Sequence, residues 1–367
     1  MPQKKKADKI FVLIFSILIS FGFFLFASAS LGVFAKNKDS FISVFMNQTF
    51  LGLGVGLLIL FILSHIHYKK YKQYAFYLFL VGLIISCLVF VPGLGIKHGG
   101  ARRWLDVLGF SFQTAEFLKF SFVLYFAALL SSFSSKIQQW QFSALPTTIL
   151  LLIISIISFL QPDYGTFIII AITAVGMVFV AGIRIKHLAV IIGSALVTVV
   201  PIALYFKPYV WQRLLTFFHP TENILSSGYQ ITQSLIAIGS GGIFGKGFGK
   251  SIQKFGLLPE PMGDSIFAVT AEEWGFVGSM ILLSLFLLFA FRGFQIANKS
   301  SDVFGRLLGV GIVILIVSQS FINVASMLNI LPMIGMPLIF VSQGGTALLF
   351  ALAEVGILLN ISKYKKS

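Results

Sequence analysis

Long apolar stretches alternate with short polar segments along the whole chain. The stretches approach the ~20 residues that a helix needs to cross a bilayer, and they lack the alternating pattern of ~10-residue barrel strands. The pattern predicts an all-α integral membrane protein, a single polytopic domain over residues 1–367 with about ten transmembrane helices. The expected spans are 10–34, 48–66, 75–92, 116–133, 146–160, 165–182, 187–206, 265–291, 306–330 and 338–361.

Two polar segments separate these spans more widely than the others. One is the loop of about residues 93–115, and the other is the longest loop, about 207–264, between the seventh and eighth spans. Lysines at both chain ends indicate the cytoplasmic side, because cytoplasmic segments carry an excess of Lys and Arg. An even number of spans then places both termini in the cytoplasm and both loops outside it. The terminal lysines are Lys4, Lys5, Lys6, Lys363, Lys365 and Lys366.

Composition supports the membrane assignment. The chain is 57% hydrophobic and only 11% charged, whereas a soluble domain carries roughly a quarter charged residues. The net charge of +15 is spread over the loops, which indicates contact with anionic membrane lipids and not with nucleic acid. The single cysteine, Cys87, excludes an internal disulfide framework and a cysteine metal site.

Both outer loops carry basic residues that work against the expected topology signal. A site for an anionic group at the outer surface would explain them, since Arg binds phosphate in a bidentate manner and Lys supplies a compact charge. The alternative is that long loops cross the membrane regardless of their charge. The residues concerned are Lys97, Arg102, Arg103, Lys207, Arg213, Lys246, Lys250 and Lys254.

Four acidic positions are candidates for chemistry or for structure. Asp264 lies where the long loop meets the eighth span, and an ionisable group at membrane depth is a functional candidate. Glu116 lies three residues before Lys119, so the two share a helix face, either as an interfacial ion pair or as part of a charged cavity. Asp163 either caps the sixth helix or contributes to a site. Glu354, inside the last span, has no assigned role.

The glycine-rich run at 239–251 ends in Gly249-Lys250-Ser251, like a phosphate-binding P-loop. The spacing of that motif requires glycine at position 244, which is Phe244, and no buried strand precedes the run. A nucleotide site is therefore rejected. A flexible loop whose backbone amides lie near an anionic head group is the alternative that stays open.

Five motifs in order resemble the SEDS family of polytopic membrane proteins, the group that contains FtsW, RodA and SpoVE. Asp264 coincides with the family's catalytic Asp, although Met262-Gly263 and Ser265 replace its usual neighbours. His219-Pro220 and Gln343 also depart from the family pattern. The motifs are Gly-Ala-Arg-Arg-Trp at 100–104, Phe-Gln-Thr-Ala-Glu-Phe-Leu-Lys at 112–119, Gln-Pro-Asp-Tyr-Gly-Thr at 161–166, Gly-Tyr-Gln-x-x-Gln-Ser at 228–234 and Ser-Gln-Gly-Gly-Thr at 342–346.

The resemblance implies a peptidoglycan glycosyltransferase that polymerises lipid II at the outer face of the cytoplasmic membrane. It implies a class B penicillin-binding protein as partner, together with other divisome proteins. Residues 249–254 and 258–260 are more similar to the division branch than to the elongation branch. A lipid II flippase or transporter, an elongation-type polymerase and a catalytically inactive division scaffold are the alternatives.

A mechanism follows from this resemblance. The 4-hydroxyl of one sugar attacks the anomeric carbon of the growing strand, and a single inverting displacement expels the lipid diphosphate. Asp264 is the predicted general base, with a pKa raised by desolvation. The predicted substrate contacts are Arg102, Arg103, Lys119 and Arg213 at the diphosphate, Glu116 orienting Lys119, Asp163 positioning a loop or sugar, and Gln230 and Ser234. No soluble cofactor is implied, and Mg²⁺ or Mn²⁺ is a candidate aid.

Overall fold

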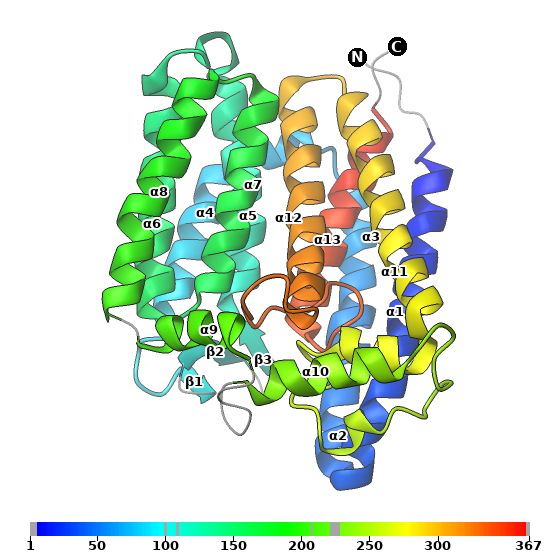
Figure 1. Cartoon of the computed structure of the whole chain (residues 1–367). Helices are drawn as coiled ribbons and strands as arrows, with labels where there is room; N and C mark the ends of the chain where they lie inside the picture. The colour runs from blue at the N-terminus through cyan, green and yellow to red at the C-terminus, as the bar shows by residue number, and fades with distance from the viewer. Residues whose placement is uncertain (1–5, 99–100, 108–109, 207, 221–227, 365–367) are drawn as a thin grey trace.

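The computed structural model is a bundle of long helices with both chain ends at the same end (Figure 1). It describes residues 6–98, 101–107, 110–206, 208–220 and 228–364. Gly100 and Lys207, and the lysines at 4, 5, 365 and 366, lie outside the described residues. We call the end of the bundle that carries the chain ends the termini end, and the opposite end the site end.

The predicted fold class is confirmed. Within the described residues, nine helical segments are long and apolar enough to cross a membrane, and α8 provides the expected seventh span. The helices are α1 Lys9–Lys36, α2 Lys38–Met46, α3 Gly56–His65, α4 Lys69–Leu88, α5 Thr114–Ser132, α6 Ala144–Leu160, α7 Tyr164–Ala181, α8 Ile185–Phe206, α9 Pro208–Phe218, α10 Tyr229–Ser240, α11 Ile266–Asn298, α12 Val303–Met327 and α13 Gly345–Ser362. A π-helical segment, Asn47–Val55, joins α2 to α3, and short 3-10 turns occupy Ser134–Lys136, Trp140–Phe142 and Gln253–Phe255.

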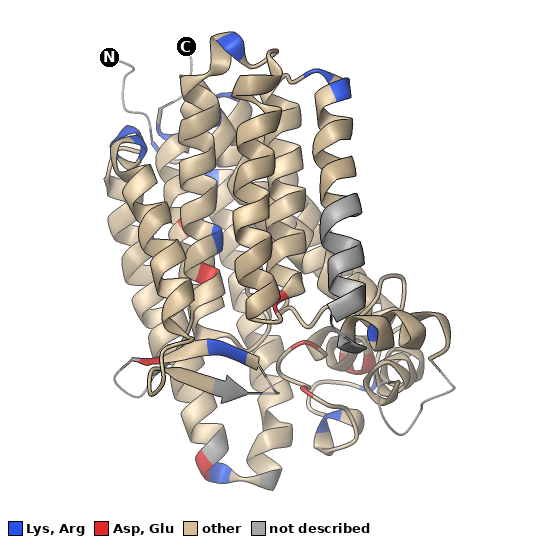
Figure 2. Ribbon diagram, turned by 90° about the vertical axis from the view of Figure 1, so that its left-hand side faces the viewer, with Lys and Arg blue, Asp and Glu red and all other residues tan. Residues whose placement is uncertain are grey.

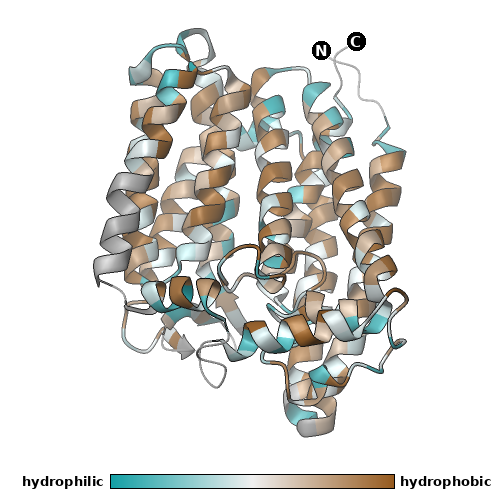
Figure 3. Ribbon diagram, in the orientation of Figure 1, coloured by the Kyte–Doolittle hydropathy of each residue, from teal (hydrophilic) through white to brown (hydrophobic). Residues whose placement is uncertain are grey.

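Polar and apolar surfaces follow the expected membrane pattern. Lys and Arg lie mostly at the two ends of the bundle (Figure 2), and apolar residues cover its middle (Figure 3). Most of α5, α12 and α13 is buried, whereas α4 and the span Phe41–His65 expose most of their surface. The three buried helices therefore form the centre of the bundle, and α4 and the span Phe41–His65 lie at its surface.

The last span begins later than expected. The apolar pattern predicted a helix over 338–361, but α13 starts only at Gly345. Pro332 and Pro337 lack the amide hydrogen that a helix needs, and Gly335 has a φ of +74°. Residues 328–344 consequently form a loop that lies against the site end of the bundle (Figure 1).

The first outer loop contains a small sheet that hydropathy did not predict. Strands β1 (Gly95–His98), β2 (Ala101–Val107) and β3 (Phe110–Gln113) pair antiparallel in the order β1-β2-β3. Trp104 of β2 lies opposite Gln113 of β3. The strands have only four to seven residues, so their alternation is too short to separate from a polar loop.

The longest helix, α11, is broken at Gly275, which has a φ of +65°. The glycine-rich run predicted as a loop fills this break. The amides of Lys246 and Gly247 donate to the carbonyl oxygens of Glu272 and Glu273, at 3.0 and 2.9 Å. Backbone groups released by the break are thereby satisfied inside the protein, as a membrane environment requires.

Candidate functional site

A cavity of ≈ 500 Å³ lies at the site end, between segments that are far apart in the sequence. The π-helical segment, β2, α9, the loop before α11 and the loop before α13 all contribute to its walls. Its charged lining residues are Arg103, Arg213, Glu260 and Asp264. The structure thus brings three of the predicted site residues, Arg103, Arg213 and Asp264, into one cavity.

Asp264 lies in the loop directly before α11 and is partly exposed to the cavity. Its main chain is fixed, because the Asn323 side chain donates one hydrogen bond to the Asp264 carbonyl at 2.8 Å and another to the Met336 carbonyl at 2.7 Å. Burial raises the pKa of Asp264 to about 6, and the Glu260 carboxylate adds to the rise. The cations Arg213 and Arg103 act in the opposite direction.

Arg213 projects from α9, a short helix that lies across the site end (Figure 1). Its Nη1 donates to the Met333 carbonyl at 2.6 Å. Burial and the charge of Arg103 lower the pKa of Arg213 to about 10, against the attraction of Asp264 and Asp163. The guanidinium therefore stays protonated at neutral pH.

Helix α9 is amphipathic. Opposite Arg213 it exposes Trp211, Leu215 and Phe218, spaced four and three residues apart on one helix face. A helix that is apolar on one face and cationic on the other suits the boundary between head groups and acyl chains. The polar face of this helix, through Arg213, forms part of the cavity wall.

Gly335 lies between the carboxylate and the guanidinium. A Cβ atom on this residue would meet Asp264 Oδ2 at 3.3 Å and Arg213 Nη2 at 3.5 Å. Its φ of +74° also disfavours any other residue. Glycine at this position therefore keeps open the space between the two charged groups.

Neighbouring arginines of β2 have different surroundings. Side chains alternate between the faces of a strand, so Arg103 shares a face with the buried residues Ala101 and Leu105, whereas Arg102 is exposed. Arg103 donates to the carbonyl oxygens of Gln161, at 3.3 Å, and Pro162. Only Arg103 of the pair lines the cavity, a distinction that the loop prediction could not make.

Asp163 caps α7, as one of its two interpretations predicted. Its carboxylate accepts from the Thr166 amide at 3.4 Å and from the Thr166 hydroxyl at 2.8 Å. The side chain is buried and does not line the cavity. It acts on the site through its charge, which raises the pKa of Arg213.

Glu116 and Lys119 lie in the first two turns of α5, and both are buried. Their ion pair of 2.8 Å is buried in α5, and Lys119 also donates to Gln319 at 2.6 Å. Neither residue lines the cavity, so the structure does not bring Lys119 together with the arginines. Glu354 of α13 is also buried and does not line the cavity.

Gln230 and Ser234 of α10 lie behind the cavity wall. Gln230 donates to the Ser265 hydroxyl at 3.0 Å, and the Ser234 hydroxyl donates to the Gln230 carbonyl at 2.8 Å. Ser265 follows Asp264 and precedes the first residue of α11. The placement of the two α10 residues therefore supports the carboxylate's segment without lining the cavity.

The sequence reasoning missed several polar residues of the cavity and its supports. Gln48 donates to the Ser342 carbonyl at 3.1 Å and accepts from the Gly344 amide at 2.9 Å, which fixes the loop before α13. The Ser342 hydroxyl donates to the Gly263 carbonyl at 2.7 Å, next to Asp264. Amides inside apolar helices, such as Gln48 and Asn323, were the available signal, because buried polar groups need partners.

A second charged cluster lies around the break in α11. Lys254 is fully buried and pairs with Glu273 at 2.6 Å, and Lys246 pairs with Glu272 at 2.7 Å. Glu273 also accepts from the Ser28 hydroxyl at 2.5 Å. This cluster holds the glycine-rich loop in the break.

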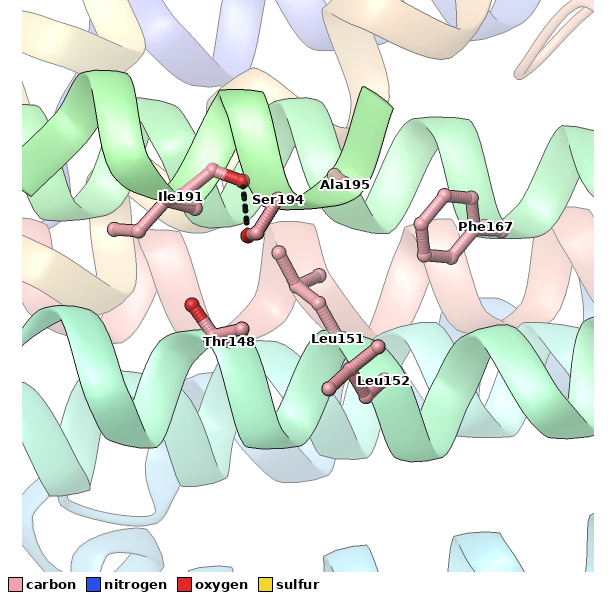
Figure 4. A pocket seen from close by; sticks show the side chains of 7 residues that line it. All are labelled: Thr148, Leu151, Leu152, Phe167, Ile191, Ser194 and Ala195. Carbon is pink, nitrogen blue, oxygen red and sulfur yellow. Dashed lines mark hydrogen bonds between the residues drawn. The ribbon is translucent and has the colours of Figure 1, made fainter. Parts of the chain in front are cut away.

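One other gap in the bundle is too small for a substrate. An apolar space between α6, α7 and α8, lined by Leu151, Phe167 and Ile191, has a volume of only ≈ 10 Å³ (Figure 4). That is room for about one water molecule. Ser194 at its edge donates to the carbonyl of Ile191 at 2.9 Å (Figure 4).

Comparison with known proteins decides the family. The family model for FtsW, RodA and SpoVE, described as cell cycle protein, matches residues 8–367. The chain belongs to the SEDS family. Stage V sporulation protein E of Bacillus subtilis strain 168 is 36% identical over 366 residues, which cover 99% of each chain.

Other SEDS relatives extend the comparison. FtsW of Geobacter sp. strain M18, named a probable peptidoglycan glycosyltransferase, is 35% identical over 370 residues, covering 99% of this chain and 98% of the relative. A solved structure from work on polymerization and crosslinking by a peptidoglycan synthase complex has a TM-score of 0.79 and 27% identity, covering 97% of each chain. The RodA crystal structure from Thermus thermophilus has a TM-score of 0.71 and 26% identity, covering 98% of each chain.

Proposed function

We propose that this SEDS protein is a peptidoglycan glycosyltransferase that polymerises lipid II into glycan strands. The observation that carries the proposal is the cavity in which Asp264 faces two arginines, Arg103 and Arg213. The glycosyltransferase name of the FtsW relative and the synthase complex among the solved structures agree with this assignment.

The proposed orientation places the site end outside the cytoplasm. The junctions between helices at the termini end carry clusters of basic residues, such as Lys69, Lys70 and Lys72 where α4 begins and Arg184 and Lys186 where α8 begins, and cytoplasmic segments carry such residues in excess. Both termini then lie in the cytoplasm, and the cavity faces the side on which glycan strands are assembled.

In the proposed reaction, Asp264 removes the proton from the 4-hydroxyl of the acceptor sugar. The hydroxyl oxygen attacks the anomeric carbon of the donor strand, and the bond from that carbon to the lipid diphosphate breaks. Arg103 and Arg213 stabilise the negative charge that develops on the diphosphate. One carboxylate suffices because the neutralised diphosphate leaves without an acid, and the α-linked donor gives a β-linked product.

The diphosphate of the substrate could bind a divalent cation together with carboxylates of the cavity. Within the described residues, no group of three His, Cys, Asp or Glu side chains comes together. Mg²⁺ is usually held by one or two carboxylates and substrate phosphates, and Glu260 and Asp264 are two such carboxylates at the cavity. With Mg²⁺ or Mn²⁺ bound there, the cation would supply further neutralisation of the diphosphate.

The proposed biological role is septal synthesis together with a class B penicillin-binding protein and other divisome proteins. The glycine-rich loop and the segment 258–260 support the division branch. An elongation role, as for RodA, is the alternative within the family. Complementation of cells depleted of their own FtsW or RodA would distinguish the two roles.

The deciding experiment incubates the purified full-length protein, with and without its penicillin-binding partner, with labelled lipid II. Long glycan strands are the expected product. Movement of lipid II between leaflets without any polymer would instead identify a flippase. The absence of both activities, with and without the partner, would support a scaffold.

A further inference from the structure

Two amide side chains on one face of α12 hold the loop that carries Gly335. Gln319 and Asn323 are four residues apart, and therefore neighbours on the helix surface. Gln319 Nε2 donates to the carbonyl of Pro337 at 3.1 Å, and Asn323 Nδ2 donates to the carbonyl of Met336 at 2.7 Å. These are two consecutive carbonyl groups at the edge of the cavity.

The buried ammonium of Lys119 determines how the Gln319 amide is oriented. Lys119 Nζ donates to Gln319 Oε1 at 2.6 Å, and both residues have an exposed fraction of 0%. A lysine ammonium can only donate, and a carbonyl can only accept. A flipped amide would place its NH₂ group against the ammonium and its oxygen against the Pro337 carbonyl. Lys119 therefore directs the amide donor towards Pro337.

Hydrogen bonds then link the centre of the bundle to the reacting carboxylate. Met336 and Pro337 directly follow Gly335, so the two amides also fix the position of this glycine. A Cβ atom at Gly335 would lie 3.3 Å from Asp264 Oδ2 and 3.5 Å from Arg213 Nη2. Asn323 also binds the main-chain carbonyl of Asp264. Helix α12 thus fixes both the loop before α13 and the main chain of Asp264.

We propose that Gln319 is a positioning residue, which transmits the placement of Lys119 to the cavity. Lys119 then acts from within the bundle and does not contact the diphosphate. Glu116 holds the ammonium in place through their ion pair of 2.8 Å. This inference rests on the proposed transferase function, because its measurable consequence is a change in the rate of polymerisation.

The test compares two substitutions of Gln319 with a neighbouring control in the full-length protein. Gln319→Met removes both hydrogen bonds. Gln319→Glu keeps an acceptor for Lys119 but cannot donate to Pro337 when ionised. Ser320→Ala is the control, because the buried Ser320 hydroxyl bonds only to the Ile316 carbonyl of its own helix.

We expect both Gln319 variants to lower kcat for lipid II polymerisation by roughly 10–100-fold, the effect of a displacement of about 1 Å in a reacting group. The KM for lipid II should stay within about threefold, because no cavity-lining group is removed. The kcat of Ser320→Ala should equal that of the wild type. The kcat must be calculated per folded molecule, quantified by size-exclusion chromatography, because a misfolded fraction would also lower the apparent kcat and leave KM unchanged.

Coupling to Lys119 supplies a second measurement. Lys119→Met should lower kcat to a similar extent, and the double variant with Gln319→Met should be no slower than either single variant, because both act through one link. Additive losses, or a Lys119→Met variant whose KM for lipid II rises about tenfold or more, would overturn the proposal.

Three outcomes separate the two hypotheses. If the wild type makes no polymer, the transferase function fails. If the wild type polymerises and Gln319→Glu retains wild-type kcat, only the positioning role fails. If Gln319→Met does not accumulate as folded protein, the Gln319→Glu variant, which has nearly the same shape, decides alone.

Discussion

Two groups of acidic residues near the start of α11 have opposite surroundings. Glu272 and Glu273 lie in a cluster where lysines and hydroxyl groups bind their carboxylates. Asp264, two residues before the helix, has no hydrogen bond or ion pair to its carboxylate from the described residues and faces a cavity instead. The carboxylates of Glu272 and Glu273 are therefore fully hydrogen-bonded and structural, whereas the carboxylate oxygens of Asp264 stay available to accept a hydrogen bond or a proton.

The difference shows how one short segment of the chain can carry both a stabilising cluster and a carboxylate that is available to a substrate. A carboxylate surrounded by donors is stabilised in its ionised form and becomes a poor base. A buried carboxylate without direct partners is costly to ionise, and its pKa of about 6 suits proton transfer near neutral pH. Substitutions in the two groups should therefore have different consequences.

The largest effect is expected for Asp264→Asn. Loss of the general base should reduce polymerisation by roughly 10²–10⁴-fold, while the folded protein stays in the membrane. Strand length and amount from labelled lipid II provide the measurement. The exposed Asp39 at the same end is the matched control, and Asp39→Asn should be fully active. Normal polymer from Asp264→Asn would remove this carboxylate from the mechanism.

The second effect concerns the stability of the cluster around Glu272 and Glu273. Lys254→Met leaves Glu273 buried without its cation, a change that costs roughly 3–5 kcal/mol. The thermal unfolding midpoint in detergent should fall, while activity per folded molecule should change little. Lys250→Met, an exposed lysine in the same loop, is the control. Equal midpoints for the two variants would contradict the assignment of a structural role.

The third test uses the two neighbouring arginines. Arg103→Gln should lower kcat by roughly 10²-fold, because a donor to the leaving diphosphate is lost. Arg102→Gln, on the exposed face of the same strand, should stay within about threefold of the wild type. Equal losses from both variants would indicate a general requirement for positive charge in place of a directed contact.

A smaller effect is expected from Gly335→Ala. The added methyl group enters the space between Asp264 and Arg213, and the positive φ adds strain, so we expect kcat to fall by roughly 10-fold. Gly193→Ala in α8 is the control, since a Cβ atom there has open space. A fully active Gly335→Ala variant would show that this gap is wider than the reaction needs.

The smallest effect is the pH dependence. Because Asp264 must be ionised to accept a proton, kcat should be about half-maximal near pH 6 and fall about tenfold per unit below it. Glu260→Gln should move this midpoint to lower pH, because the charge of Glu260 raises the pKa of Asp264. A midpoint near pH 4 in the wild type would contradict the buried environment.

The same pKa affects stability with a defined sign. The folded protein binds the Asp264 proton more tightly than the unfolded chain, whose carboxyl has a value of 3.8. The stabilisation is complete below the unfolded value and is lost as the pH rises through about 6. Asp264→Asn, which is never ionised, should therefore unfold at a higher temperature than the wild type at pH 7.

The sequence predicted the membrane helices well because each is a long apolar segment. It also singled out Asp264, Arg103 and Arg213, which the structure brings into one cavity. The burial of charged side chains was harder to predict. The spacing of Glu116 and Lys119 fixed their shared helix face but not their burial, since that depends on α12 and α13 covering α5.

The end of the loop before α13, residues 338–344, is predicted as part of the last span because it begins with an apolar run. Its shape depends on side chains from elsewhere, such as Gln48 and Asn323, that bind its carbonyl and amide groups. Such long-range partners leave no local pattern. For the same reason, the different roles of Arg102 and Arg103 required the strand geometry.

The bare backbone at Gly335 has a consequence for selectivity between sugar and water. At Gly335, between Asp264 and Arg213, the described backbone contributes no side chain to the wall, so in the proposed reaction a bound saccharide would complete it. A lone water molecule lacks the bulk to do so, and it would sit there without a fixed direction of approach. Productive alignment would then require the acceptor sugar, and the activated donor would be spared from wasteful hydrolysis.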